Sequence, residues 1–501
     1  MFMAASQERM FFFVKKNQKT FAHYGGCRNR RYSYYKSFLL LFSKKKCLFS
    51  NMRLISRFGT LFGHPRGLAV LAATELWERI SFHGMAALLT LYMAEQLLLP
   101  GHVERIDGFP AFRGAIEGAT GPLSVQALAA QIFGLYIGLV NFATVAGGYI
   151  GDRWLGRRRA VALGAGLMTF GHLLMAFDAT FLAALLLLIL GAGLLRGNLV
   201  AQVGTLYPPG DPTAANGVQI YYAMVNTGFF IGPLLTGYLA ETFGWHWGFG
   251  FAGLGMLTGF AVYLAGTAQL AAPAARARPS RRALTRAERL TCLKLLALIP
   301  ILTLYWIDQT QYWNVYNIWV RDHVDLRVQG WTMPVAWLQS LAGIMATLPV
   351  PLVLLFWRML ARRGMRLTAI QKLALGCFGF GMSTIWDGCA TLAFPALHSV
   401  PLLWLVIANC GEGFFYLHVQ PVAVALYARA APASVSAMMV GLYYLTNFAG
   451  GVISGRLGAF YEVLSPSHFW FLHAAIAITA APLLLVAGRL MRLAEDGVAA
   501  G

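Results

Sequence analysis

The chain has few charged residues for its length: Asp, Glu, Lys and Arg make up 12% of its 501 residues. Soluble proteins carry roughly 25%. Cysteine is also scarce, with six residues and no CxxC pair, so neither a disulfide framework nor a zinc or redox centre is indicated. No nucleophile-elbow motif of a serine hydrolase is present. Apolar residues instead reach 58% and mean hydropathy is +0.59, which predicts an all-α membrane protein without cofactor or metal rather than an enzyme.

Lysine almost disappears after residue 51. Residues 1–51 hold seven of the nine lysines and eleven Lys/Arg residues in all, against the single acid Glu8. One interpretation is a basic arm that binds anionic lipid or nucleic acid. The abrupt change in usage favours a second interpretation, in which these residues are translated upstream sequence and Met52 is the natural start. We therefore expect no nucleic-acid partner.

Apolar runs long enough to cross a bilayer, about 20 residues each, recur twelve times after residue 67. They are too long and too uniformly apolar for barrel strands, so they predict membrane-spanning helices. The predicted spans are 68–98, 127–150, 159–178, 181–204, 216–239, 246–268, 292–319, 335–357, 368–392, 401–427, 435–463 and 469–490.

Arginine placement predicts the orientation and the domains. Alternate loops are rich in arginine, above all 153–159, 276–289 and 358–366, which places them and both chain ends in the cytoplasm, in what we expect to be a bacterial inner membrane. Two six-helix halves joined by a linker predict a substrate site between them near mid-membrane. The expected parts are a basic extension 1–51, an N-terminal bundle 52–268, a cytoplasmic linker 269–290, a C-terminal bundle 291–492 and a tail 493–501.

The loop between the second and third spans has a recognisable pattern of glycine, Asp and Arg. It resembles the loop signature of the major facilitator superfamily, which implies the twelve-helix fold of that superfamily; the alternative is a generic basic loop. Its glycines would let helices approach closely, and its Asp would pair with an Arg as the halves rock. The gating residues expected here are Gly151, Asp152, Arg153, Gly156 and Arg157.

Ionisable residues at bilayer depth are costly and usually functional. The first span has three on one helix face, at positions i, i+3 and i+4. We expect the first of these acids to pair with the Arg, leaving the second partly uncompensated. The alternative is a buried ion-pair network that only holds helices together. The six residues are Glu75, Glu78, Arg79, Arg196, Asp308 and Glu412, on the first, fourth, seventh and tenth spans.

Residues Glu75–Gly84 resemble the ExxERFxYYG motif of the proton-dependent oligopeptide transporter family. Segments 191–211, 221–237 and 244–251 are similar to further signatures of that family, and 308–309, 337–340, 411–412 and 438–441 are looser matches. The resemblance covers about residues 58–490. It implies a symporter that imports di- or tripeptides or similar zwitterions together with protons by alternating access, acting as a monomer in membrane lipid.

The resemblance also implies roles for individual residues. A peptide needs a cation for its carboxylate and an anion for its amine; Arg196, helped by Arg79, suits the first and Glu412 the second. The residues expected in proton coupling are Glu75, Glu78, Arg79 and Asp308. The expected substrate site is completed by Tyr136, Asn226, Trp313 and His83, the last of which is either a titrating residue or an ordinary buried polar group.

The chain departs from the family pattern at four places. Arg196 stands where Lys is usual, Ala86 where an Arg is, Phe82-His83 where two tyrosines are, and Ala342 where Asn is common. These changes leave open a second function, in which the same fold carries a non-peptide anion or an amino-acid conjugate. A third, from another class, is a non-transporting membrane sensor, which would bind without turnover.

Overall fold

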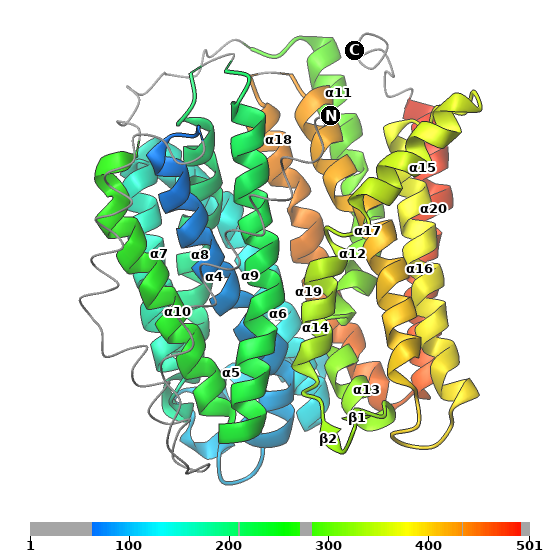
Figure 1. Cartoon of the computed structure of the whole chain (residues 1–501). Helices are drawn as coiled ribbons and strands as arrows, with labels where there is room; N and C mark the ends of the chain where they lie inside the picture. The colour runs from blue at the N-terminus through cyan, green and yellow to red at the C-terminus, as the bar shows by residue number, and fades with distance from the viewer. Residues whose placement is uncertain (1–62, 209–210, 271–282, 433, 492–501) are drawn as a thin grey trace, which may run out of the picture. The chain divides into compact units, whose positions relative to one another are not determined.

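A computed structural model describes residues 63–208, 211–270, 283–432 and 434–491. The expected extension 1–51 and tail 493–501 lie outside the described residues, as does most of the expected linker. The described residues belong to one compact unit. Within it, two helical bundles stand side by side (Figure 1). Helices α4 to α10 form the N-bundle and helices α11 to α20 form the C-bundle.

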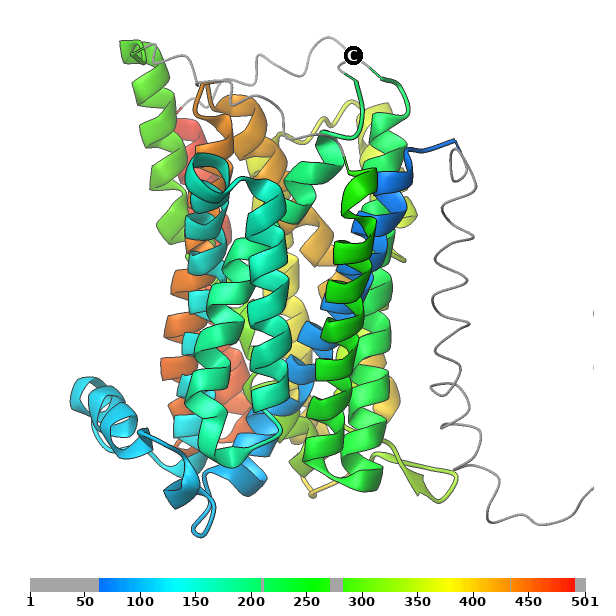
Figure 2. The same ribbon diagram turned by 90° about the vertical axis from the view of Figure 1, so that its left-hand side faces the viewer.

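The N-bundle begins at a proline and alternates direction at each helix. Its helix α6 is capped by Ser124, whose side chain accepts a hydrogen bond from the Ala127 amide at 3.2 Å. Short α5 projects from the end of the bundle (Figure 2). The helices are α4 (Arg66–Tyr92), continued by a π-helix (Met93–Leu97), α5 (Phe109–Thr120), α6 (Val125–Ile150), α7 (Arg157–Leu174), α8 (Phe181–Gly204), α9 (Ala214–Phe243) and α10 (Trp245–Gly266).

The C-bundle is built from shorter pieces. Helices α11 and α16 each start with a capping box, at Thr285 with Glu288 and at Thr368 with Gln371. A two-strand hairpin, β1 (Arg327–Val328) with β2 (Trp331–Thr332), closes one loop. The helices are α11 (Arg286–Ala297), α12 (Ile299–Gln311), α13 (Val315–His323), α14 (Ala336–Met345), α15 (Val350–Arg362), α16 (Ala369–Ala393), α17 (Leu402–Ala430), α18 (Ser436–Tyr443), α19 (Leu445–Gly458) and α20 (Pro466–Met491).

Every predicted span lies in one of these helices or in a run of them. Eight helical segments within the described residues are long and apolar enough to cross a membrane, and the pair α14–α15, bent by 41°, would make a ninth. The three other predicted spans lie in α4, α7 and α16, which carry charged residues inside or at the start of the helix. The structure therefore confirms an all-α membrane protein of two helical bundles and is consistent with twelve spans.

The sequence predicted continuous helices for the seventh, eighth and eleventh spans, and the structure shows each of them interrupted. The seventh is divided into α11, α12 and α13, the eighth into α14 and α15, and the eleventh into α18 and α19. Proline lies at the α14–α15 bend, where residue 349 precedes α15. Residues 312–314 form a turn between α12 and α13. Such breaks leave backbone groups free to line a cavity, which an unbroken helix cannot do.

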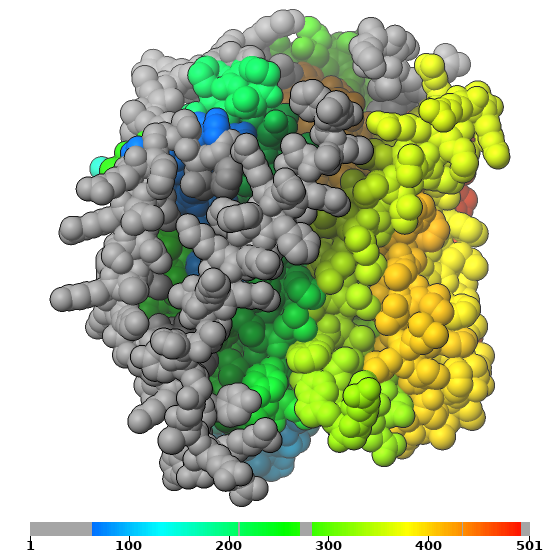
Figure 3. Space-filling view, in the orientation of Figure 1, coloured from blue at the N-terminus to red at the C-terminus, as the bar shows by residue number. Residues whose placement is uncertain are grey.

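The two bundles meet most closely in the half of the molecule that contains the β1–β2 hairpin, called here the hairpin half. Gly134 of α6 packs against Gly451 and Gly455 of α19, where a Cβ on Gly134 would stand 2.4 Å from the Gly451 carbonyl. Helices α9 and α14 also pack together, and their surfaces adjoin in Figure 3. The opposite half, which holds the start of α11 and the end of α10, is called the linker half.

Hydrogen bonds and an ion pair also join the bundles in the hairpin half. Arg321 Nη1 of α13 lies 2.9 Å from Glu95 Oε1, just beyond α4. Asn314 Nδ2 donates to the Ala130 carbonyl at 3.0 Å, and Trp337 Nε1 donates to the Leu234 carbonyl, also at 3.0 Å. These contacts close the hairpin half between the bundles.

Candidate functional site

A cavity of about 230 Å³ lies between the two bundles. The N-bundle contributes two cations and the C-bundle an acid to its wall, so the two signs of charge come from opposite bundles. The remaining wall is mainly aromatic and amide side chains. Of the predicted site residues, the cavity is lined by Arg79, His83, Arg196, Trp313 and Glu412.

Behind the cationic wall, Glu78 joins both arginines. Arg196 Nε of α8 donates to Glu78 Oε1 at 3.1 Å, and Arg79 Nε lies 3.0 Å from Glu78 Oε2. Glu78 is fully buried. The expectation that Glu78 is partly uncompensated is therefore wrong. Its neighbour Arg79 lies on the same helix, whereas Arg196 lies on α8. Residue spacing along α4 could not predict that second contact.

Glu75 is held by two partners, as its position in α4 allows. Arg79 Nε donates to Glu75 Oε1 at 2.6 Å, which confirms the expected pair. The hydroxyl of Tyr221, in α9, donates to Glu75 Oε2 at 2.6 Å. Gly228 of α9 permits this approach, because a Cβ there would lie 2.5 Å from the Arg79 Cβ. The two acids and two arginines form one buried network with matched charge, called here the N-cluster (Glu75, Glu78, Arg79 and Arg196).

Arg196 is the member of the N-cluster with spare binding capacity. Its guanidinium carbon stands 3.8 Å above the centre of the Phe82 ring, a cation–π contact that fixes its orientation. Its Nη2 atom is buried with no hydrogen-bond partner among the described residues. Tyr136 stacks on Phe82 with 6.4 Å between the ring centres and is not among the residues that line the cavity. The free nitrogen suits a carboxylate entering the cavity.

His83 forms an aromatic stack that spans both bundles. Its ring lies parallel to that of Phe229 in α9, with 4.1 Å between the ring centres. Trp313, in the turn between α12 and α13, lies 5.3 Å from His83 and 5.0 Å from Phe229. His83 Nδ1 is buried without a partner in the described part of the chain. This stack forms an aromatic wall of the cavity.

The opposite wall is acidic. Glu412 of α17 lines the cavity and is 7% exposed. Asp308 of α12 is 2% exposed and lies behind the wall, where the hydroxyl of Thr384 in α16 donates to its Oδ2 at 2.9 Å. The structure thus brings the two predicted acids of the C-bundle into one region, with α16 between them.

Sequence reasoning missed Asp387 of α16, which is 1% exposed. Its carboxyl group shares a side-chain hydrogen bond with Glu412, and Asp308 acts on it electrostatically. An ionisable residue at bilayer depth was the signal applied to four other spans, and the same rule applied to 368–392 would have found it. The three acids Asp308, Asp387 and Glu412 are called here the C-cluster.

His172 of α7 was also missed. It is fully buried, and neither ring nitrogen has a hydrogen-bond partner among the described residues. It acts electrostatically on Glu78, so it lies behind the N-cluster and away from the cavity wall. Asn226 of α9, which was predicted to bind substrate, is not among the residues that line the cavity.

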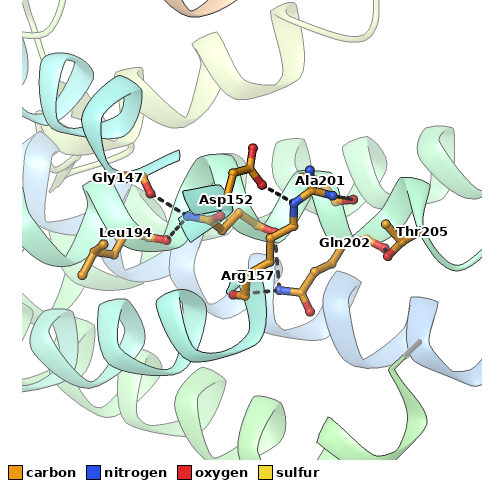
Figure 4. A network of polar contacts seen from close by, with 8 residues as sticks. Gly147, Asp152, Arg157, Leu194, Ala201, Gln202 and Thr205 are labelled. Carbon is orange, nitrogen blue, oxygen red and sulfur yellow. Dashed lines mark hydrogen bonds and ion pairs between the residues drawn. The ribbon is translucent and has the colours of Figure 1, made fainter. Parts of the chain in front are cut away.

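Hydrogen bonds hold the predicted gating loop against α8 (Figure 4). Asp152 Oδ1 accepts from Arg157 Nε at 2.7 Å, within the loop itself. The Asn198 side chain donates to the carbonyls of Gly147 and Leu194, both at 2.9 Å. Gly151 is required beside it, because a Cβ there would stand 2.0 Å from Asn198 Oδ1. The Asp152 pair therefore stays inside the N-bundle.

The other two gating residues differ in surroundings. Gly156 has a φ of 79°, which favours glycine, and it immediately precedes α7. Arg153 lies over the Tyr149 ring with 6.0 Å between its guanidinium carbon and the ring centre.

Comparisons with known proteins agree with this architecture. Residues 158–279 and 274–471 match the family model described as the POT family. The chain is 28% identical to a peptide transporter, YePEPT, of Yersinia enterocolitica, over 87% of this chain and 96% of the relative. It is 25% identical to a di-/tripeptide transporter of Lactococcus lactis subsp. cremoris, over 85% and 96%.

Solved structures are similar over the same length. A crystal structure of a peptide transporter POT in complex with sulfate has a TM-score of 0.75 and 26% identity, over 86% of this chain and 96% of the other. A mutant of a peptide transporter POT in complex with alafosfalin has a TM-score of 0.73, with the same identity and coverage.

Proposed function

Because the chain belongs to the POT family of transporters, we propose that it imports small peptides or peptide-like zwitterions with protons, by alternating access. The observation that carries this is the division of charge across the cavity. Within the described residues, Arg196 of the N-bundle has a guanidinium nitrogen without a hydrogen-bond partner, and Glu412 of the C-bundle supplies a carboxyl group to the cavity wall. A zwitterion with a carboxylate at one end and an ammonium at the other matches both.

Binding both ends of such a substrate would draw the bundles together around the cavity. Alternating access requires such a link between the bundles, since one face opens only while the other is closed. The closed contacts in the hairpin half, including the Arg321–Glu95 pair, would separate when that half opens. Arginine-rich loops surround the linker half, so we place this half and both chain ends in the cytoplasm.

The proton would travel on buried carboxyl groups. Arg196 stays protonated in any state, so the acids of the two clusters must exchange the proton. Glu78 is the member of the N-cluster that would lose a partner when Arg196 turns to a substrate carboxylate. A proton on Glu78 would then replace the lost positive charge.

Uptake of labelled Ala-Ala into proteoliposomes, with and without an inward proton gradient, tests the proposal. The protein is made from Met52, and Arg196→Ala is compared with Arg196→Lys. We expect gradient-driven uptake by the wild type, reduced at least about tenfold in Arg196→Ala, because a hydrogen bond to a charged group contributes about 1.5–3 kcal/mol. Arg196→Lys keeps the charge and is expected to retain part of the uptake.

Arg113→Ala is the matched control, since it removes an arginine paired with a glutamate, Glu117, in α5 outside the predicted spans. Its uptake should equal that of the wild type. Folded wild-type protein without uptake of Ala-Ala would contradict ordinary dipeptide transport.

A second candidate is transport of a non-peptide anion or an amino-acid conjugate. Ala86 and Ala342 both line the cavity, where their side chains offer no polar atom for a peptide backbone. Competition against a bound reporter by dipeptides, amino-acid conjugates and organic anions separates the two candidates. A non-transporting sensor would bind in the same assay and show no uptake.

A further inference from the structure

Two carboxyl groups of the C-cluster touch. Asp387 of α16 and Glu412 of α17 share a side-chain hydrogen bond. A hydrogen bond between two carboxyl groups needs one proton, because two ionised carboxylates both only accept. Asp387 Oδ1 is buried with no further partner among the described residues. Two buried acids that act on each other in this way are expected to hold one proton between them.

The packing of α16 on α17 creates this contact. Gly411, next to Glu412, has no side chain, and a Cβ there would stand 2.5 Å from the hydroxyl oxygen of Ser383. Ser383 lies one helical turn before Asp387, on the same face of α16. The close approach of the two backbones brings the helix faces that carry the two acids together.

The surroundings of the pair contain no compensating cation in the described part of the chain. Asp308 faces it from α12, and the phenols of Tyr312 and Tyr316 act on it from the end of α12 and from α13. From α20, the ring of Phe471 and the Cβ of Trp470 pack on the neighbouring Gly388. Two negative charges without a cation at this depth would be very costly, so the pair needs two positive charges, from protons or a substrate ammonium, to be neutral.

We propose that Asp387 is a proton-holding residue of the transport site, which shares one proton with Glu412 while the cavity is empty and keeps it when a substrate ammonium binds Glu412. This rests on the proposed function and deepens it. On binding, the proton moves from the Glu412 carboxyl to the Asp387 carboxylate, and the ammonium replaces it beside Glu412. The pair is then neutral with one ammonium and one proton together, which links the two cargoes.

The isosteric variant Asp387→Asn tests this by two measurements. In the first, proton-driven uptake of Ala-Ala is compared with counterflow, the exchange of Ala-Ala across the membrane without a gradient. With Asn at 387, Glu412 is neutralised by the ammonium alone. We expect proton-driven uptake to fall about tenfold while counterflow stays within about twofold of the wild type, because the proton site is lost and the ammonium site remains.

Asp387→Glu restores an acid and should recover part of the coupling. Asp325→Asn, which removes an exposed acid beside Arg327 in the hairpin loop, is the matched control and should change neither assay. Equal loss of uptake and counterflow in Asp387→Asn would mean a merely structural role and would overturn the proposal, as would a response to the gradient equal to that of the wild type.

The second measurement does not depend on transport. Infrared difference spectra of the folded protein at neutral pH report the C=O stretch of a protonated, buried carboxyl group. We expect this band in the wild type and in Asp325→Asn, and a shift of its frequency in Asp387→Asn, because the proton on Glu412 then loses its carboxylate partner. A band unchanged in Asp387→Asn overturns the proton sharing. Absence of Ala-Ala uptake by the wild type would instead count against the proposed function, with the spectra still deciding the assignment of Asp387.

Discussion

The two bundles bury charge in different ways. In the N-cluster, two glutamates meet two arginines, and each acid lies within 3.1 Å of an arginine nitrogen. In the C-cluster, three acids lie together, and no lysine or arginine acts on them within the described residues. The N-cluster can remain ionised when the cavity is empty, whereas the C-cluster must hold protons or a cation.

This difference suggests that the N-cluster and the C-cluster have different roles in coupling. A balanced network resists change until a new anion competes for one of its arginines. An unbalanced acidic pair accepts either a proton or an ammonium, and both are the expected cargo. Removing one charge should therefore harm the N-cluster more than the C-cluster, which the following substitutions examine.

Glu78→Gln should have the largest effect. It removes the acid shared by Arg79 and Arg196 and leaves buried positive charge without its partner, which costs about 3 kcal/mol or more. Thermal unfolding in detergent should occur at a clearly lower temperature, and proton-driven uptake should be lost. Glu117→Gln breaks a partly exposed Glu–Arg pair in α5 and should lower the unfolding temperature far less. Equal stability of the two variants would contradict the balanced N-cluster.

Tyr221→Phe should come next. It deletes the hydroxyl that donates to Glu75 Oε2, at a cost of about 1–2 kcal/mol, and leaves the ring packing intact. Tyr222→Phe is the matched control, since Tyr222 is 49% exposed. The measurement is the difference in unfolding temperature between the two variants, and no difference would show that Glu75 does not need Tyr221.

Thr384→Val should have a smaller effect on stability. It removes the hydrogen bond to Asp308 Oδ2, worth about 0.6 kcal/mol inside a membrane protein. Thr384→Ser keeps the hydroxyl and should resemble the wild type. Because Asp308 would lose a donor to its ionised form, the pH at which proton-driven uptake is half-maximal should rise in Thr384→Val. An unchanged pH profile would place Asp308 outside the proton path.

Asp308→Asn should have the smallest effect on stability. It takes away one of three like charges and leaves no cation of the described residues unpaired, so the unfolding free energy should change by less than it does in Thr384→Val. Proton-driven uptake should nevertheless fall. A loss of stability comparable to that of Glu78→Gln would show that Asp308 has a cationic partner, and the contrast between the clusters would disappear.

Much of the site could be predicted because membrane burial makes charge conspicuous. Arg79, Arg196 and Glu412 were found as ionisable residues at bilayer depth, and all three line the cavity. The pair of Glu75 with Arg79 followed from helix spacing. Tyr136 and Asn226 were predicted to bind substrate, but they do not line the cavity. The sequence gives no sign of which neighbour an aromatic or amide residue inside a helix will face.

The sequence by itself determined the class of the protein, the approximate positions of its spans, the two-bundle division and the family. Hydropathy and periodicity are local properties, and they survive in the fold because lipid forces every spanning segment to satisfy its own backbone. Only the tertiary structure decided which charges meet. Glu78 meets Arg196 across 118 positions, and Asp387 meets Glu412, because packing brings separate helices together. No rule of spacing along one helix describes that approach.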